Sequence, residues 1–190
     1  MALVTGGAGF IGTNLIIELA RLNIDVESID NYSTGKIENH QNCCSYITND
    51  MISIDELKQV ISPDIDVIFH LAADSRIQPS LNNPHKSIKN NIISTINILQ
   101  YSKENNIKLI FAGSSTAIHP MSSPYAWSKY FCEELCKYSA LTNKTKILIS
   151  RLFSVFGNYQ IEDGKHATVI GIFNRQFRKK GLLTITGSGE

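Results

Sequence analysis

The sequence predicts an α/β fold in which one parallel sheet carries helices on both of its faces. Short apolar segments of strand length alternate along the chain with longer segments whose apolar residues recur at helical spacing. This alternation is typical of a parallel sheet, because parallel neighbours are joined by long crossovers rather than by tight turns. Hydrophobic residues make up 43% of the 190 residues and charged residues 18%, a composition that can bury a core and excludes a disordered or fibrous chain.

The strands and the two outermost helices follow from the apolar pattern alone. The first helix is expected at 10–22 and the last at 167–180, since both segments repeat apolar residues at helical spacing. The expected strands are short apolar runs, at residues 2–5, 24–29, 46–48, 66–71, 108–112 and 146–150, with a further candidate at 182–186.

The remaining helices carry start signals. Ser53 and Glu56 form a capping box for a helix that ends near residue 61. Pro84 opens a long helix to about residue 105, because proline is favoured at the first helical position. Ser123 and Pro124 begin another helix to about residue 141, as cap and first helical residue.

Charge and cysteine usage exclude several classes of function. The net charge is +1, so no basic field is available to hold nucleic acid. No apolar run approaches the ~20 residues that span a bilayer, and the first residues lack a secretory signal, so we expect no membrane partner. The pairs Cys43–Cys44 and Cys132–Cys136 lack metal-ligand spacing. We therefore expect no metal, reduced thiols and a cytoplasmic protein.

A glycine-rich turn joins the first strand to the first helix. Gly6, Gly9 and Gly12 allow a sharp turn, a close approach of a pyrophosphate to the backbone, and tight packing of the helix on the strand. Asp30 ends the second strand, 18 residues beyond Gly12, where an acid accepts hydrogen bonds from the adenosine ribose and disfavours a 2′-phosphate. The turn therefore predicts a Rossmann-type, doubly wound sheet that binds NAD. The alternative is a glycine turn that only packs a helix.

A second group of residues predicts chemistry at the same edge of the sheet. Tyr125 and Lys129 lie four residues apart and share one helix face. Thr116 follows the fifth long strand, at the carboxyl edge where open parallel sheets bind ligands. A tyrosine serves as a base at neutral pH only if nearby positive charge favours its ionised form, and the Lys129 ammonium and an oxidised nicotinamide would both supply it. The alternative is a half-buried tyrosine beside a solvated lysine.

Taken together, these segments resemble a known family over the whole chain. The chain is similar to the extended short-chain dehydrogenases/reductases of the NAD-dependent epimerase/dehydratase family, and most similar to nucleotide-sugar epimerases of the UDP-glucose 4-epimerase type. The segments that carry the resemblance are Thr5-Gly-Gly-Ala-Gly-Phe-Ile-Gly12, Asp30-Asn-Tyr-Ser-Thr-Gly35, His70-Leu-Ala-Ala73, Asn91-Ile-Ile-Ser-Thr95, Ser114-Ser-Thr-Ala117, Pro124-Tyr-Ala-Trp-Ser-Lys129, Arg151-Leu-Phe-Ser-Val-Phe-Gly157 and Leu183-Thr-Ile-Thr-Gly-Ser-Gly-Glu190.

The resemblance implies a role for each matching residue. Tyr125 is the base, Lys129 its partner and a ligand of the nicotinamide ribose, and Thr116 the hydroxyl that orients the sugar. The residues implied to bind NAD run along the chain: Gly6, Gly9, Phe10, Ile11, Gly12, Asp30, Asn31, Ser33, Thr34, Gly35, Asp50, Met51, Leu71, Ala72, Ala73, Asn91, Tyr125, Lys129 and Phe153.

The activity that the resemblance implies is epimerisation at C4 of a nucleotide sugar, a UDP-hexose in the first instance, through transient oxidation to a 4-keto sugar. Related dehydratases carry Asp-Glu after the catalytic threonine and related decarboxylases a Glu, whereas this chain has Ala117 and Ile118. Ser154 stands where many relatives have a substrate-binding asparagine. The alternatives are another NAD(P)-dependent nucleotide-sugar reductase or dehydratase, including one like the GDP-fucose synthases, and a non-catalytic NAD-sensing module.

The resemblance also predicts organisation. Residues 1–165 would be the NAD-binding domain and residues 166–190 the start of a small substrate domain that is largely absent from the chain. A homodimer through the helices around Ile92 and Phe131 is implied. Tyr125 follows Thr116 by only nine positions, fewer than in the family, and we expect a break in the backbone between Ala117 and Ser123.

Overall fold

A computed structural model describes residues 1–164, 166–185 and 187–188. Its strands are β1 (Ala2–Thr5), β2 (Val26–Asp30), β3 (Cys44–Thr48), β4 (Val67–His70), β5 (Lys108–Ser114) and β6 (Ile147–Leu152). They form one sheet in the order β3-β2-β1-β4-β5-β6, and every neighbouring pair is parallel. The predicted doubly wound sheet is confirmed, and the bounds of its six strands lie within two residues of the predicted ranges.

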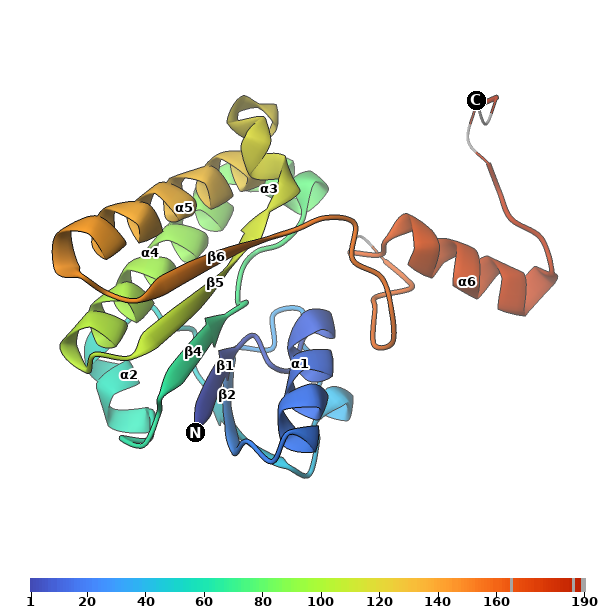
Figure 1. The fold of residues 1–190 in the computed structure, drawn as a ribbon. Helices are drawn as coiled ribbons and strands as arrows, with labels where there is room; N and C mark the ends of the chain where they lie inside the picture. The colour runs from blue at the N-terminus through green and yellow to red at the C-terminus, as the bar shows by residue number, and fades with distance from the viewer. Residues whose placement is uncertain (165, 186, 189–190) are drawn as a thin grey trace.

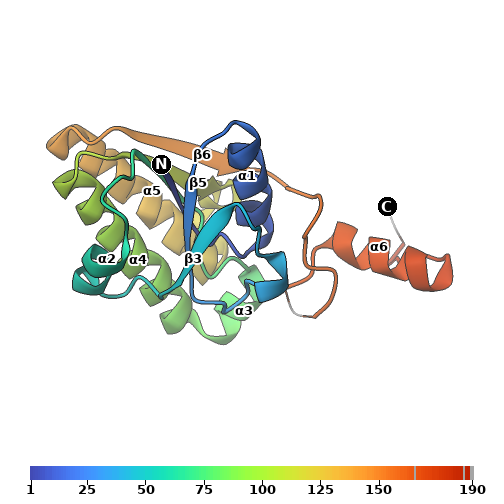
Figure 2. The ribbon, with the colours of Figure 1, turned by 90° about the horizontal axis from the view of Figure 1, so that it is seen from below.

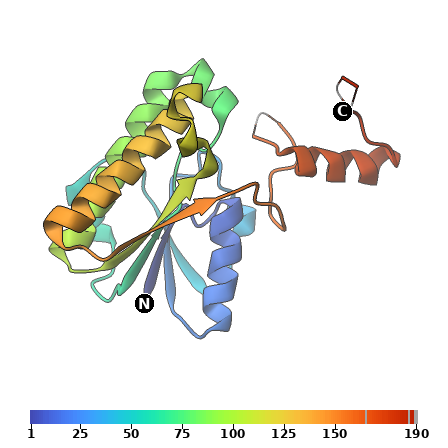
Figure 3. The ribbon, with the colours of Figure 1, turned by 45° about the horizontal axis from the view of Figure 1, so that its top comes forward.

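Helices cover both faces of this sheet (Figures 1 and 3). One face carries α1 (Phe10–Arg21), and the other carries α2 (Ile54–Val60), α4 (Pro84–Glu104) and α5 (Pro124–Asn143). Two cores result, because alternate residues of a strand point to opposite faces. Val4 packs with Ile16 and Leu19 of α1, whereas Leu3 belongs to the larger core under α2, α4 and α5.

The strand order changes direction between β1 and β4. From β1 the chain builds outward to β2 and β3 on one side, and from β4 outward to β5 and β6 on the other. Thr5, Ile29 and His70 stand side by side, so the carboxyl ends of the central strands meet at one edge. Ligands of open α/β sheets bind at such a switch point.

The helix signals were correct with small differences. Ser53 accepts a hydrogen bond from Glu56 N at 3.3 Å, as expected for the first half of the capping box. The Glu56 carboxylate instead accepts from Asn49 Nδ2, at 3.4 Å. A short helix, α3 (Ile77–Asn82), precedes α4 and was not predicted, because six residues including a proline carry too little pattern.

The expected break between Ala117 and Ser123 is wrong. The chain runs continuously through two short 3₁₀ helices, η2 (Ser115–Ile118) and η3 (Pro120–Ser122). His119 N donates to Thr116 O and Ser122 N to His119 O, both at 3.0 Å. Nine residues suffice because these tight turns fold the connection against the start of α5.

The last part of the chain leaves the sheet. Helix α6 (Val169–Lys180) stands away from the other helices (Figures 1 and 2). The strand candidate at 182–186 is not a strand over 182–185, and Thr186 lies outside the described residues. Lys165, Gly189 and Glu190, which fall in the predicted domain boundary and in the last family-like segment, also lie outside them. Among the helices described, none has the length and apolar character that crossing a membrane requires.

Candidate active site

A cavity of about 1000 Å³ lies along the carboxyl edge of the strands. This volume is at the upper end of the range for pockets that hold small molecules and cofactors. Its walls come from the β1–α1 turn, the ends of β2, β4 and β5, and the helices α4 and α5. Segments far apart in the sequence therefore meet around one space.

The glycine turn forms one wall by leaving side chains out. Gly6 has a φ of +74°, and a Cβ there would lie 2.9 Å from Ala72 N, so only glycine fits. A Cβ on Gly12 would overlap the carbonyl oxygen of Gly6. At Gly9 a Cβ would meet only that oxygen, at 3.2 Å, so this residue keeps the mouth of the turn open. The backbone N–H groups at the start of α1 therefore border the cavity, an arrangement that suits a pyrophosphate.

Asp30 lies under the next part of the wall. Its carboxylate accepts hydrogen bonds from Ala8 N at 3.0 Å and from Tyr32 N at 2.8 Å. Burial raises the pKa of this carboxyl, and the two backbone hydrogen bonds oppose the rise. A Cβ on Gly35 would lie 2.9 Å from both carboxylate oxygens, so glycine is required where the loop crosses Asp30. Asn31, Ser33 and Thr34 line the cavity beside it.

A chain of hydrogen bonds connects the central strands to the helices. Thr95 donates to the Asn91 carbonyl at 2.7 Å, so its hydroxyl oxygen accepts from His70 Nε2, 3.2 Å away. His70 Nδ1 then accepts from Thr5 Oγ1 at 2.8 Å. Burial, and secondarily the Lys129 charge, lowers the pKa of His70 to about 3. His70 is thus a neutral connector between β1, β4 and α4.

Asn91 extends this chain of hydrogen bonds to α5. Its side chain donates to Ser128 Oγ at 2.9 Å and accepts from Asp74 N at 2.7 Å. Ser128 Oγ in turn donates to the Tyr125 carbonyl at 2.8 Å. The first turn of α5 is therefore held against α4 and the loop that follows β4.

Thr116, Tyr125 and Lys129 all line this same cavity. Lys129 is only 4% exposed, and its ammonium lies 4.4 Å from the centre of the Phe111 ring. No ion pair of Lys129 occurs within the described part of the chain. A buried cation without a carboxylate partner favours negative charge in its surroundings. The predicted meeting of the Tyr–Lys pair with the glycine turn is thus present.

Most of the predicted cofactor residues border the cavity, and two do not. The residues that border it are Gly6, Gly9, Phe10, Ile11, Gly12, Asp30, Asn31, Ser33, Thr34, Asp50, Met51, Leu71, Ala72, Ala73, Asn91, Tyr125 and Lys129. Gly35 lies behind Asp30, and Phe153 is 61% exposed. Leu152 and Ser154 line the cavity, whereas Phe153 between them is not among its lining residues.

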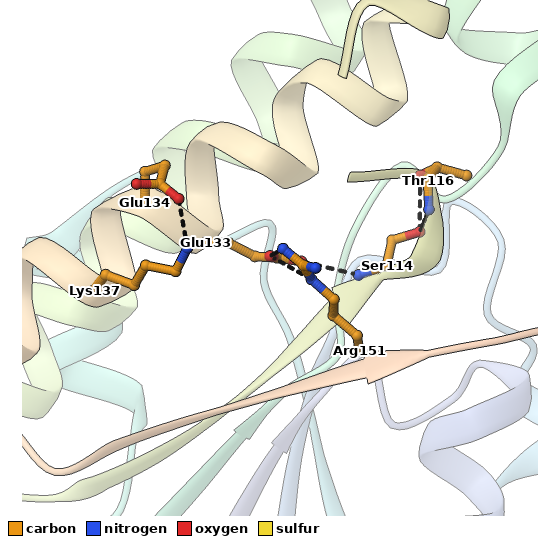
Figure 4. A network of polar contacts seen from close by, with 6 residues as sticks. All are labelled: Ser114, Thr116, Glu133, Glu134, Lys137 and Arg151. Carbon is orange, nitrogen blue, oxygen red and sulfur yellow. Dashed lines mark hydrogen bonds and ion pairs between the residues drawn. The ribbon is translucent and has the colours of Figure 1, made fainter. Parts of the chain in front are cut away.

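Sequence reasoning missed Glu133. This residue of α5 is 1% exposed, and its carboxylate binds Arg151 of β6 and the backbone of Ser114 in β5 (Figure 4). Glu133 follows Lys129 by four residues and Tyr125 by eight. An extension of the helical spacing one turn further would have placed it on the same face.

The model of the NAD-dependent epimerase/dehydratase family matches residues 2–190. The chain belongs to this family. The family uses NAD, and the lack of a side chain at Gly9 leaves space for a dinucleotide at the glycine turn.

Curated relatives carry more than one activity in their names. A Methanocaldococcus jannaschii protein described as a UDP-glucose 4-epimerase is 33% identical over 205 residues, covering 100% of this chain and 67% of the relative. The UDP-glucuronic acid decarboxylase 1 of Xenopus tropicalis is 28% identical, covering 99% of this chain and 48% of the relative. The chain thus spans about half to two thirds of the length of these relatives.

Solved structures show the same fold. The UDP-glucose 4-epimerase of Thermotoga maritima, solved with UDP-glucose, is 29% identical with a TM-score of 0.91, over 100% of this chain and 66% of that one. The UDP-glucose 4-epimerase of Thermus thermophilus in complex with NAD is 26% identical with a TM-score of 0.86, over 96% of this chain and 64% of that one.

Proposed function

We propose that this chain is the NAD-binding part of a nucleotide-sugar 4-epimerase that acts on a UDP-hexose. Residues 1–165 would hold NAD, and residues 166–190 would begin the region that binds the sugar nucleotide. The observation that carries the proposal is that Thr116, Tyr125 and Lys129 border the same cavity as the glycine turn. Relatives described as UDP-glucose 4-epimerases support the substrate class.

The roles of the binding residues follow from their positions along the cavity. The α1 end of the glycine turn would hold the pyrophosphate by backbone N–H groups. Asp30, with Asn31, Ser33 and Thr34 beside it, would hold the adenosine ribose, and Asp50 and Met51 would flank the adenine. The remaining residues would line the path to the nicotinamide: Leu71, Ala72, Ala73 and Asn91. Phe153 gains no support for such a role, since it does not line the cavity and is 61% exposed.

The chemistry needs a proton acceptor, a positive charge and an orienting hydroxyl. Tyr125 would accept the proton of the sugar 4-hydroxyl and later return it. The buried ammonium of Lys129 would favour the phenolate and bind the nicotinamide ribose. Thr116 would hydrogen-bond the reacting oxygen. NAD, when bound, would supply the reversible oxidation at C4, and rotation of the keto sugar in the site would expose its opposite face to reduction.

Ala117 and Ile118 bear on the choice between epimerase and decarboxylase. Neither carries a carboxylate, and Ala117 is buried. The elimination and decarboxylation chemistry of relatives would need an acid or base at this place, so epimerisation is the better supported reaction.

Incubation with UDP-glucose, followed by NMR of the C4 epimer, tests the proposal. We expect UDP-galactose to accumulate, and Tyr125→Phe to lower kcat by about 10²- to 10⁴-fold, the usual contribution of a general base. Tyr138→Phe, at an exposed tyrosine on the same helix, is the control and should retain the parent rate. Release of CO₂ from UDP-glucuronic acid, with no epimer from UDP-glucose, would contradict the epimerase proposal and indicate a decarboxylase.

Assembly and location remain predictions. The homodimer implied by the family resemblance would pair α4 and α5 of two copies, and Ile96 and Tyr130 on these helices are exposed. Sedimentation equilibrium at micromolar concentration measures the mass of the assembly. A cytoplasmic location remains an expectation from cysteine usage and can be tested by fractionating cells.

A further inference from the structure

The buried carboxylate of Glu133 lies directly behind the end of β5. Its oxygen Oε2 accepts from Arg151 Nε at 2.8 Å and lies 2.7 Å from a terminal guanidinium nitrogen of Arg151. Its other oxygen accepts from Ser114 N at 3.3 Å. One side chain of α5 thus binds both β5 and β6 (Figure 4). A buried carboxylate is retained in a fold only where such partners compensate its lost hydration.

The sequence makes room for this carboxylate. Gly113 precedes Ser114 in β5, and a Cβ there would lie 2.6 Å from Glu133 Oε1. Any other residue would push Glu133 away from the strand. The glycine, the acid and the arginine therefore form one unit at the cavity edge.

The same unit reaches the hydroxyl of Thr116 through Ser114. Ser114 Oγ accepts from Thr116 N at 3.3 Å and lies 2.8 Å from Thr116 Oγ1. Ser114 is thus fixed at its backbone N–H by Glu133, while its side chain holds the residue that borders the cavity. Glu133 itself is not among the residues that line the cavity.

We propose that Glu133 is a positioning residue that sets the place of the Thr116 hydroxyl through Ser114, with Arg151 as the charge that keeps the Glu133 carboxylate in place. This inference rests on the proposed function, in which Thr116 orients the reacting oxygen. It predicts that removing the charge of Glu133 impairs the reaction step more than it impairs binding, because the hydrogen bonds and the ion pair of Glu133 go to Ser114 and Arg151 and not to the residues proposed to bind NAD.

The test is Glu133→Gln, with Glu134→Gln as the matched control. Glu134 is the neighbouring residue on α5, and its ion pair with Lys137, at 2.6 Å, lies on the exposed side of the helix (Figure 4). For Glu133→Gln we expect kcat with UDP-glucose to fall about 10- to 100-fold, the cost of a catalytic group displaced by about 1 Å. KM and the Kd for NAD should stay within about threefold, because the binding walls are unchanged. Glu134→Gln should match the parent in all three.

Two kinetic outcomes would overturn the inference: an unchanged kcat in Glu133→Gln, or kcat, KM and NAD affinity that deteriorate together with the thermal transition. Arg151→Lys gives a second variant if Glu133→Gln folds poorly. It keeps a positive charge near Glu133 and loses the forked geometry, so a smaller loss of kcat at constant KM is expected.

Hydrogen exchange separates this inference from the proposed function. If the parent turns over no sugar nucleotide, the epimerase proposal fails, and the amides of Ser114 and Thr116 then decide. Exchange at least about tenfold faster at these two amides in Glu133→Gln, with NAD affinity kept and Glu134→Gln unchanged, supports the positioning role. Parent-like exchange at both amides rejects it.

Discussion

The two ends of the cavity are built in opposite ways. At the β1–α1 turn the wall is bare backbone, and the critical feature is the lack of side chains at Gly6, Gly9 and Gly12. At the β5–α5 end the wall is held by buried charged side chains, those of Lys129 and Glu133. The first end is controlled by steric fit, and the second by electrostatic compensation.

Each end should therefore be sensitive to a different kind of substitution. The stability of the glycine turn should respond to added volume more than to removed charge. The β5–α5 end should respond to removed charge and tolerate small changes of volume.

Gly12→Ala should have the largest effect on the fold. The new Cβ would overlap the Gly6 carbonyl oxygen and lie 2.6 Å from Gly7 Cα, and backbone atoms cannot move aside cheaply. We expect the free energy of unfolding to fall by about 3 kcal/mol or more, at the upper end of the cost of overpacking. Urea unfolding followed by circular dichroism measures it.

Gly9→Ala sharpens this prediction. Its Cβ would meet one oxygen at 3.2 Å, so stability should change by less than about 1 kcal/mol. NAD affinity, measured by calorimetry, should nevertheless fall because the methyl group occupies the mouth of the turn. Equal loss of stability in the two variants would show that steric crowding does not distinguish these glycines.

His70, in β4 between the two ends, provides a test through pH. Its pKa is lowered from 6.5 to about 3 in the folded protein, so between these values the unfolded chain binds more protons. The stability contributed by neutral His70 is therefore complete above pH 6.5 and is lost as pH falls towards 3. The parent should lose up to about 1.4 kcal/mol per pH unit more than His70→Gln in this window.

Denaturant unfolding of parent and His70→Gln at pH 5, 7 and 9 measures this term. Between pH 7 and 9 the difference between the two proteins should stay constant, since His70 is neutral in both states there. A constant difference from pH 5 to 9 would mean that His70 is not buried as a neutral ring.

The contrast also explains what the sequence could predict. The glycine turn, Asp30 and the Tyr125–Lys129 pair are local patterns, whose spacing alone brings each to the carboxyl edge. Glu133 and Arg151 are 18 residues apart on different elements, and their contact depends on the register of β6 beside β5. A single sequence contains no local pattern that predicts such a contact. For the same reason the folded connection after Thr116 could not be foreseen, because its turns are held by packing on α5.

Asp30→Asn should have a moderate effect on ligand choice and also lower stability, because the amide nitrogen cannot accept one of the two backbone hydrogen bonds that the carboxylate accepts. The amide keeps the shape of the carboxylate and removes the negative charge that would repel a 2′-phosphate. We expect the ratio of NADP to NAD affinity to rise about tenfold, equivalent to about 1.4 kcal/mol. Calorimetric titration of both nucleotides measures the ratio. Asp25→Asn, in the exposed segment before β2, is the control and should leave the ratio unchanged.

Lys137→Ala should have the smallest effect, although Lys137 pairs with Glu134 at a distance as short as those in the Glu133 network. The two Lys137–Glu134 side chains are 51% and 44% exposed, against 1% for Glu133. Water already solvates both charges of the exposed pair, so breaking the pair leaves no buried charge without a partner. We expect the free energy of unfolding to change by less than about 0.5 kcal/mol, and less still at 1 M salt. A loss above 1 kcal/mol in urea unfolding would show that burial is not what gives the β5–α5 end its sensitivity to charge.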